Sequence, residues 1–358
     1  MLITILTFAI ILIILVLIHE AGHFFAAKLM GVKVEEFGFG LPPRAWGKKI
    51  GETIYSVNWL PIGGFVRLYG EDAMHPEKFK TERSRAFFSK KPWQRSIVLT
   101  AGVTMNFLLG WFLVSYLFTQ GVLAPSDHVI VEGVAEKSPA EQAGLKKGDE
   151  IVRFVSPEGM TIVIDSPEDL IVNTNKYLDQ EITLEMLQNG ETRHVTMTPR
   201  KNPPEGEGAM GVVVSNLVEK KYSMLEAPVQ GLHHVFEIIK LTAGGIGSSI
   251  AKLLTLRGGE AEIAGPLGIG KLVGEARRFG LTALIELTAI LSINLALINV
   301  LPFPALDGGR LAFVVVEGVT GKKMKPQWET YLHQIGMIIL LALLLIVTIN
   351  DILRFRAG

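Results

Sequence analysis

The sequence contains no cysteine and has no excess of charge of either sign. Without thiols, neither a disulfide nor a zinc site built on thiolates can form, whatever the compartment. The 35 lysines and arginines are balanced by 35 aspartates and glutamates, so no basic field points to nucleic acid as a partner. The function therefore has to be sought in local patterns.

Apolar runs of membrane-spanning length are abundant. Residues 1–18 hold no charged side chain, and at about 1.5 Å per residue they make a helix of roughly 27 Å, close to the hydrocarbon thickness of a bilayer. A cleaved signal peptide is not favoured, because the run lacks a basic start and leads directly into His19 and Glu20. Similar runs lie at about 96–119, 281–300 and 331–350. Four transmembrane helices are predicted, the first over about 1–29.

The charges between these runs predict their orientation. Basic residues outnumber acidic ones between Lys28 and Arg95, and in residues 310–325 several basic side chains stand against Glu317 alone. Cytoplasmic loops are enriched in lysine and arginine, so both segments are expected on the cytoplasmic side of the inner membrane. The long stretch 121–280 is then extracytoplasmic, because consecutive spans alternate sides.

Two soluble-looking regions interrupt the apolar runs. Residues 37–90 read as a small β-rich loop, and 121–217 reads as one compact α+β domain. Segment 218–277 is apolar but repeatedly interrupted by polar residues, and we expect an amphipathic interfacial helix there and not a fifth span. Strand-like runs in the compact domain occur at Val129–Val134, Glu150–Val155, Ile182–Leu187 and His194–Thr198.

The first predicted span ends in a motif suited to metal catalysis. His19-Glu20-Ala21-Gly22-His23 places two histidines four residues apart on one helix face, where both can bind one zinc ion. Glu20 between them can activate a water molecule as general base. The alternative is a pair of helix-face histidines without a metal. Charged side chains at the centre of a membrane-spanning helix cost about 2.5–3.5 kcal/mol each on insertion scales, and histidine costs less. Burying ionisable groups at the end of an apolar run is therefore unfavourable, which favours a functional role.

Catalytic zinc normally has three protein ligands, and Asp307 is the best candidate for the third. It follows the third apolar run in a stretch where Pro302 and Pro304 break the helix. Irregular backbone at membrane depth is tolerated only where it is buried in protein or lines a wet cavity. Taken alone, this stretch is equally compatible with an ordinary interfacial turn. However, the first and third spans run in the same direction, which brings His23 and Asp307 to the same side.

Together, the H-E-x-G-H motif of the first span and the N-x-x-P-x-P-x-L-D-G motif from Asn299 to Gly308 resemble the site-2 protease family of intramembrane metalloproteases. The resemblance implies an α-helical polytopic membrane protein whose protease domain is formed by 1–120 and 278–358. It also implies Zn²⁺ as cofactor and transmembrane proteins of the lipid bilayer as substrates. By the same resemblance the ligands are His19, His23 and Asp307, and the catalytic residue is Glu20.

Further segments match the same family. The segment from Pro61 to Val66 resembles its membrane-associated β-hairpin, and an edge strand containing Gly64, Phe65 and Val66 is expected to hold an unwound substrate in extended form. Asn299 is expected to hydrogen-bond the substrate backbone or the developing oxyanion, with helix capping as the alternative. Gly265-Pro266-Leu267-Gly268-Ile269 matches the bacterial group. Gly102-Val103 departs from the usual Gly-Pro of relatives.

The extracytoplasmic segment from Ser138 to Val152 resembles the helix-and-turn signature of a bacterial PDZ domain, and one such domain is expected. PDZ domains bind chain ends by adding them to a sheet edge, so Gly208 and Gly211 are candidates for a loop that faces a terminal carboxylate. Such a carboxylate would belong to a substrate or to the product of an upstream protease. A plain turn at this place, and a domain that only excludes bulky ectodomains, are the alternatives.

The resemblance implies regulated intramembrane proteolysis of single-span proteins, such as anti-sigma factors or remnant signal peptides. One rival is a membrane metalloprotease that completes its site with a downstream glutamate, against which the Pro-Gly setting of Asp307 argues. A PDZ scaffold with a vestigial metal site leaves the intact Glu20 unexplained. A metal transporter using Glu286 and the His233-His234 pair would call for an internal repeat, and none is visible in the sequence.

Overall fold

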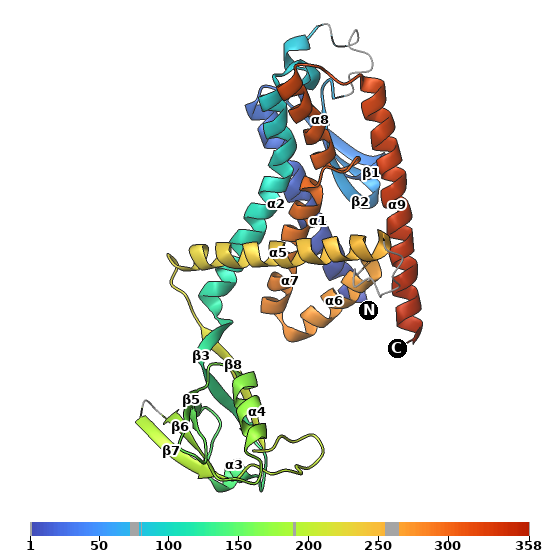
Figure 1. The fold of residues 1–358 in the computed structure, drawn as a ribbon. Helices are drawn as coiled ribbons and strands as arrows, with labels where there is room; N and C mark the ends of the chain where they lie inside the picture. Colours follow the sequence, from blue (N-terminus) through green and yellow to red (C-terminus); the bar gives the residue numbers. More distant parts are fainter. Residues whose placement is uncertain (1, 72–78, 80, 189–190, 255–264, 358) are drawn as a thin grey trace. The chain divides into compact units, whose positions relative to one another are not determined.

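The computed structural model describes residues 2–71, 79, 81–188, 191–254 and 265–357 (Figure 1). The chain divides into two compact units. The larger unit combines Met1–Thr119 with Ser223–Gly358, and the smaller unit is the intervening Gln120–Tyr222. The larger unit is therefore built from two separate stretches of sequence.

Four helices in the described part of the chain are long and apolar enough to cross a membrane. They are α1 (Leu2–Leu29), α2 (Pro92–Gln120), α7 (Leu281–Val300) and the Gln327–Leu353 portion of α9 (Pro326–Ala357). The prediction of four such helices is confirmed. Large apolar side chains such as Leu6 and Ile338 lie exposed on their outer faces, as helices surrounded by lipid require.

The helix α5 (Ala227–Leu254) begins soon after the smaller unit and is not among the candidate spans of the described residues. Figure 1 shows it running across the direction of α2. Val235 of α5 is buried in a cluster with Val114 of α2 and Ile293 of α7. The expected amphipathic helix is thus present as a helix packed on two spans, and its place at the membrane interface stays a prediction.

The helix α6 (Pro266–Phe279) is joined to α9 at its first turn. The Asp351 carboxylate of α9 accepts hydrogen bonds from the backbone N–H groups of Gly265 (3.2 Å) and Gly268 (2.8 Å). A carboxylate is favourable at this end of a helix, where unpaired N–H groups and the positive end of the dipole meet. A Cβ atom on Gly265 would lie 2.6 Å from Asp351 Oδ2. The closeness of the Asp351 carboxylate leaves no room for a side chain at position 265, which gives a physical reason for the first glycine of the Gly-Pro-Leu-Gly run.

The predicted β-rich loop consists of β1 (Val34–Ile50) and β2 (Thr53–Leu68), which pair with each other. Residues 36–39 of β1 have partners on both sides, in residues 64–67 and in residues 54–57. The segment 64–68 is consequently an outer strand. No other strand of the described chain pairs with its free edge.

The smaller unit contains a six-stranded sheet in the order β7-β6-β4-β3-β8, with β5 paired to β4. The strands are β3 (Val122–Val134), β4 (Glu150–Val155), β5 (Thr161–Val163), β6 (Ile182–Gln188), β7 (Glu191–Met197) and β8 (Val212–Lys220), and the helices are α3 (Pro139–Gln142) and α4 (Pro167–Lys176). Phe154, Leu184 and Leu170 are fully buried in its core. The four predicted strand runs lie within β3, β4, β6 and β7 or at their ends. The other two strands, β5 with only three residues and β8 with nine, are not among the predicted runs.

Candidate metal centre

The three predicted ligands come together from two helices. His19 and His23 lie one turn apart on α1, and Asp307 is the first residue of α8 (Asp307–Thr320). The Asp307 Oδ2 atom lies 3.0 Å from His19 Nε2 and 3.1 Å from His23 Nε2, and the two Nε2 atoms lie 3.3 Å apart. Within the described residues, this is the only group of three or more histidine or acidic side chains arranged to hold a metal ion.

The donor set fits zinc. Two imidazole nitrogens and one carboxylate oxygen point at a common position, and all three ligand atoms lie within 4.8 Å of one another. Three protein ligands leave a fourth position open, as in catalytic zinc sites. His19 and His23 are buried at 8% and 9% exposure, so the two imidazoles converge away from bulk solvent.

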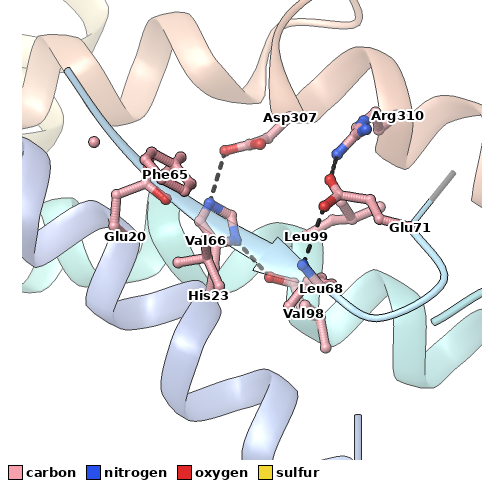
Figure 2. A pocket seen from close by; sticks show the side chains of 11 residues that line it. Glu20, His23, Phe65, Val66, Leu68, Glu71, Val98, Leu99, Asp307 and Arg310 are labelled. Carbon is pink, nitrogen blue, oxygen red and sulfur yellow. Dashed lines mark hydrogen bonds and ion pairs between the residues drawn. The ribbon is translucent and has the colours of Figure 1, made fainter. Parts of the chain in front are cut away.

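The helix α2 determines how the histidines are oriented. His23 Nδ1 lies 2.8 Å from the carbonyl oxygen of Val98, so Nδ1 donates a hydrogen bond and Nε2 is the ring nitrogen that faces Asp307 (Figure 2). The side chain of Asn106, also on α2 and fully buried, lies 3.3 Å from His19 Nδ1 through its Nδ2 atom. Neither Val98 nor Asn106 was predicted as a site residue.

Glycines allow α1 and α2 to approach so closely. A Cβ atom on Gly102 would lie 2.8 Å from His19 Cε1 and nearer still to His23 Nε2. A Cβ atom on Gly22 would lie 2.8 Å from Met105 Cγ of α2. The sequence signal for Gly102 was its match to a family motif. The departure at Val103 leaves this contact intact, because the glycine itself faces the histidines.

The loop before Asp307 is held by α9. Ala305 has a left-handed backbone (φ 78°), which is unfavourable for a residue with a Cβ atom. Its N–H group donates a 2.9 Å hydrogen bond to His333 Nδ1. One turn further along α9, a Cβ atom on Gly336 would lie 2.6 Å from the Pro304 carbonyl carbon. The fourth apolar helix therefore supports the loop that carries the third ligand, a role that its sequence did not indicate.

A cavity lies between His23 and Asp307 and the outer strand of β2 (Figure 2). Glu20 lines it, and a Cβ atom on Gly64 would lie 3.0 Å from Glu20 Cγ. The predicted substrate-contacting residues Gly64, Phe65 and Val66 are thus beside the catalytic motif. The complete lining is Glu20, His23, Gly64, Phe65, Val66, Leu68, Glu71, Val98, Leu99, Asp307 and Arg310.

An ion pair closes one side of this cavity. Arg310, one turn after Asp307, is paired with Glu71, and Glu71 also accepts a 3.3 Å hydrogen bond from the Leu68 N–H group. The Glu71 carboxylate raises the pKa of the Arg310 guanidinium, and burial acts in the opposite direction. The pair connects the end of the outer strand to the helix of Asp307.

The remaining predicted residues lie elsewhere. Asn299 is half-buried in the last turn of α7 and does not line the cavity, and no hydrogen bond of its side chain is found among the described residues. Gly208 and Gly211 belong to the smaller unit, where the Gly211 N–H group donates to the Gly208 carbonyl (3.0 Å) directly before β8. Gly211 has φ 74°, a conformation that favours glycine.

A histidine pair with an intervening glutamate, completed by an aspartate and surrounded by apolar helices, defines a membrane metalloprotease. The family model for Peptidase family M50 matches residues 7–343, and the chain therefore belongs to this zinc-dependent family, the site-2 proteases.

Relatives agree with this assignment. The chain is 32% identical over 343 residues to a protein of Clostridium perfringens, covering 95% of both chains. It is 33% identical over 345 residues to a protein of Fusobacterium nucleatum, covering 94% of this chain and 95% of the relative. It is 28% identical to a protein of Staphylococcus aureus, covering 99% of both. Each of the three is named "Putative zinc metalloprotease".

Proposed function

We propose that this metalloprotease cuts single-span membrane proteins within the bilayer, in regulated intramembrane proteolysis. The observation that carries the proposal is one cavity lined by Glu20, by two of the three convergent zinc-type ligands (His23 and Asp307) and by the free edge of a β-strand. A catalytic group, a metal site and a place for an extended peptide are thereby adjacent inside a bundle of apolar helices.

His19, His23 and Asp307 would hold the zinc ion. Zinc bound there supplies a Lewis acid that polarises the scissile carbonyl and makes a water molecule more acidic. Glu20 takes a proton from the attacking water and later delivers it to the leaving nitrogen. Glu20 suits this role because it lines the cavity without being part of the ligand group.

The outer strand 64–68 would hold the substrate. A transmembrane helix hides its carbonyl groups in internal hydrogen bonds, so the segment to be cut has to unwind first. The free edge of 64–68 offers backbone donors and acceptors that can replace the lost bonds. A Cβ atom on Gly64 would lie 3.0 Å from Glu20 Cγ, so a segment paired with this strand would pass close to the catalytic side chain. Asn299 remains a proposed substrate contact.

The smaller unit would act as an extracytoplasmic PDZ domain of an inner-membrane protein. Its strand β8 is at the edge of the sheet and pairs only with β3 among the described strands. Val213 of β8 (67% exposed) and Ile171 of α4 (53% exposed) offer apolar contacts. With Gly208 and Gly211 before β8, this edge suits the end of an extended peptide, such as the product of an upstream protease.

The decisive experiment uses the full chain reconstituted in lipid vesicles with a panel of single-span proteins whose ectodomains have been trimmed. We expect zinc-dependent cleavage by the wild type, and zinc binding without cleavage by Glu20→Gln. Glu286→Gln is the matched control, because Glu286 is an exposed acidic residue of α7 outside the cavity.

Other outcomes would separate the rival functions. Cleavage that persists in Glu20→Gln would contradict the assigned base. A PDZ scaffold would bind partners equally well with or without zinc and would cut none. A transporter would move zinc across the vesicle membrane, and Glu286→Gln would slow that movement.

A further inference from the structure

One face of α2 contacts both histidines of the metal centre. Val98, Gly102 and Asn106 follow each other at intervals of four residues, so they share a face of the helix. The carbonyl of Val98 faces His23, Gly102 allows the approach, and the amide of Asn106 faces His19. The nitrogen of each imidazole that points away from Asp307 therefore has one partner on α2.

The two partners differ in what they can offer. The Val98 carbonyl only accepts, so His23 carries its proton on Nδ1, and its Nε2 is free to bind a metal. Asn106 can either donate through Nδ2 or accept through Oδ1. It presents Nδ2 to His19 Nδ1 at 3.3 Å, and its Oδ1 is buried without a hydrogen-bond partner in the described chain.

The hydrogen bond that Asn106 makes to His19 and the tautomer of His19 depend on each other. If Nδ1 accepts from Asn106, the His19 proton is on Nε2, where it is donated to Asp307 Oδ2 at 3.0 Å. Binding through Nε2 requires the opposite tautomer, with the proton on Nδ1. Half a turn of the amide about its Cβ–Cγ bond brings the unpartnered Oδ1 to the place of Nδ2, where it accepts that proton.

We infer that Asn106 is a positioning residue that selects the metal-binding tautomer of His19 by turning its amide. This inference rests on the zinc site of the proposed function. The residue does not touch the substrate or bind the metal itself. Asn106 also contacts α7, where Ser292 donates a 2.8 Å hydrogen bond to its backbone carbonyl. This packing contact does not use the Asn106 side chain, so a purely structural role would not need the side-chain oxygen.

Zinc affinity of the full-length protein in detergent tests this inference without any substrate. Asn106→Leu keeps a similar size and removes both donor and acceptor, and we expect it to weaken zinc binding about 10–100-fold, as loss of an outer-shell partner does. Asn106→Asp keeps an acceptor and should remain close to the wild type. Thr104→Val is the control, because within the described residues the exposed Thr104 hydroxyl bonds only to the Thr100 carbonyl of its own helix.

The absorption spectrum of the Co²⁺-loaded variants provides a second readout, because it reports ligand geometry. We expect an altered spectrum for Asn106→Leu and a wild-type spectrum for Asn106→Asp. Equal zinc affinity of wild type and Asn106→Leu would overturn the inference. If Asn106→Leu does not fold, the zinc affinity of Asn106→Asp decides the question alone. A tenfold loss of zinc affinity in Asn106→Asp would refute the role of residue 106 as a hydrogen-bond acceptor. A wild type that binds no zinc would instead refute the proposed metal site.

Discussion

Gly102 of α2 lies directly against His19 of α1, and a Cβ atom on Gly102 would come within 2.8 Å of His19 Cε1. The ligand pair of the first span is thus positioned by a helix that supplies no ligand. The edges of the two imidazole rings fill the space where a side chain at position 102 would lie. The metal centre therefore requires a glycine at this position.

Gly102→Ala should therefore weaken zinc binding. The added methyl group pushes the imidazoles away from α2, and overpacking of this kind costs about 1–3 kcal/mol of folding free energy. Gly110→Ala is the matched control on the same helix, since its Cβ would lie 2.5 Å from Ile293 Cγ1, in a cluster that does not include the histidines. We expect both variants to melt at lower temperature and only Gly102→Ala to lose zinc affinity. Equal zinc affinity in the two variants would contradict the proposed role.

His333→Leu should loosen the loop that carries Asp307. The half-buried Ala305 N–H group loses its acceptor, and leaving a donor unpaired costs at most about 1–3 kcal/mol, the value for a fully buried one. We expect lower thermal stability together with weaker zinc binding, measured on the same preparation. Gln334→Leu on the exposed side of α9 is the control and should change neither. A normal zinc affinity in His333→Leu would show that Asp307 does not depend on this contact.

Gly64→Ala should reduce cleavage and leave zinc binding unchanged. The new methyl group would lie 2.9 Å from Val16 Cγ1 and 3.0 Å from Glu20 Cγ, where it displaces the catalytic carboxylate or the strand. Initial rates on a single-span substrate and the zinc content of the same sample are the two measurements. Val57→Ala, an exposed position of β2 outside the cavity, should behave as the wild type. Loss of zinc from Gly64→Ala would mean that the strand supports the metal site itself.

The turn between β1 and β2 should contribute a pH-dependent part of the stability. Glu52 accepts hydrogen bonds from Lys28 (2.8 Å) and Arg85 (2.7 Å), which lower the pKa of its carboxyl below the ordinary 4.5. Since the folded-state pKa is lowered, this stabilisation is complete above the ordinary pKa and is lost as the pH falls through the lowered one.

Thermal unfolding of wild type and Glu52→Gln in detergent checks this point. The wild type should melt at the higher temperature near neutral pH, and the difference should disappear under acid conditions, where Glu52 is protonated. The gap is expected to be small, because these side chains are about a third exposed and screened by solvent. A gap that persists in acid would assign the effect to something other than the Glu52 charge.

Much of the membrane unit could be predicted from the sequence because the signals are local. Uncharged runs of sufficient length predicted four apolar helices, and α7 (Leu281–Val300) begins and ends where its run does. The four-residue spacing of His19 and His23 is enough to place both on one face of a helix. A single carboxylate has no periodicity, so Asp307 was reached through three other arguments. These were the break caused by Pro302 and Pro304, the shared direction of the first and third spans, and a family resemblance.

The sequence by itself determined which segments are helices in an apolar setting and which residue types can bind zinc, since these follow from composition and spacing along one chain. Only the tertiary structure decided that Val98 and Asn106 hold the two imidazoles, that His333 supports the Asp307 loop, and that the free strand edge adjoins Glu20. These contacts join residues far apart in the chain, such as His19 and Asp307 at a separation of 288 positions. Which distant groups meet depends on how the helices pack, and packing depends on shape across the whole unit.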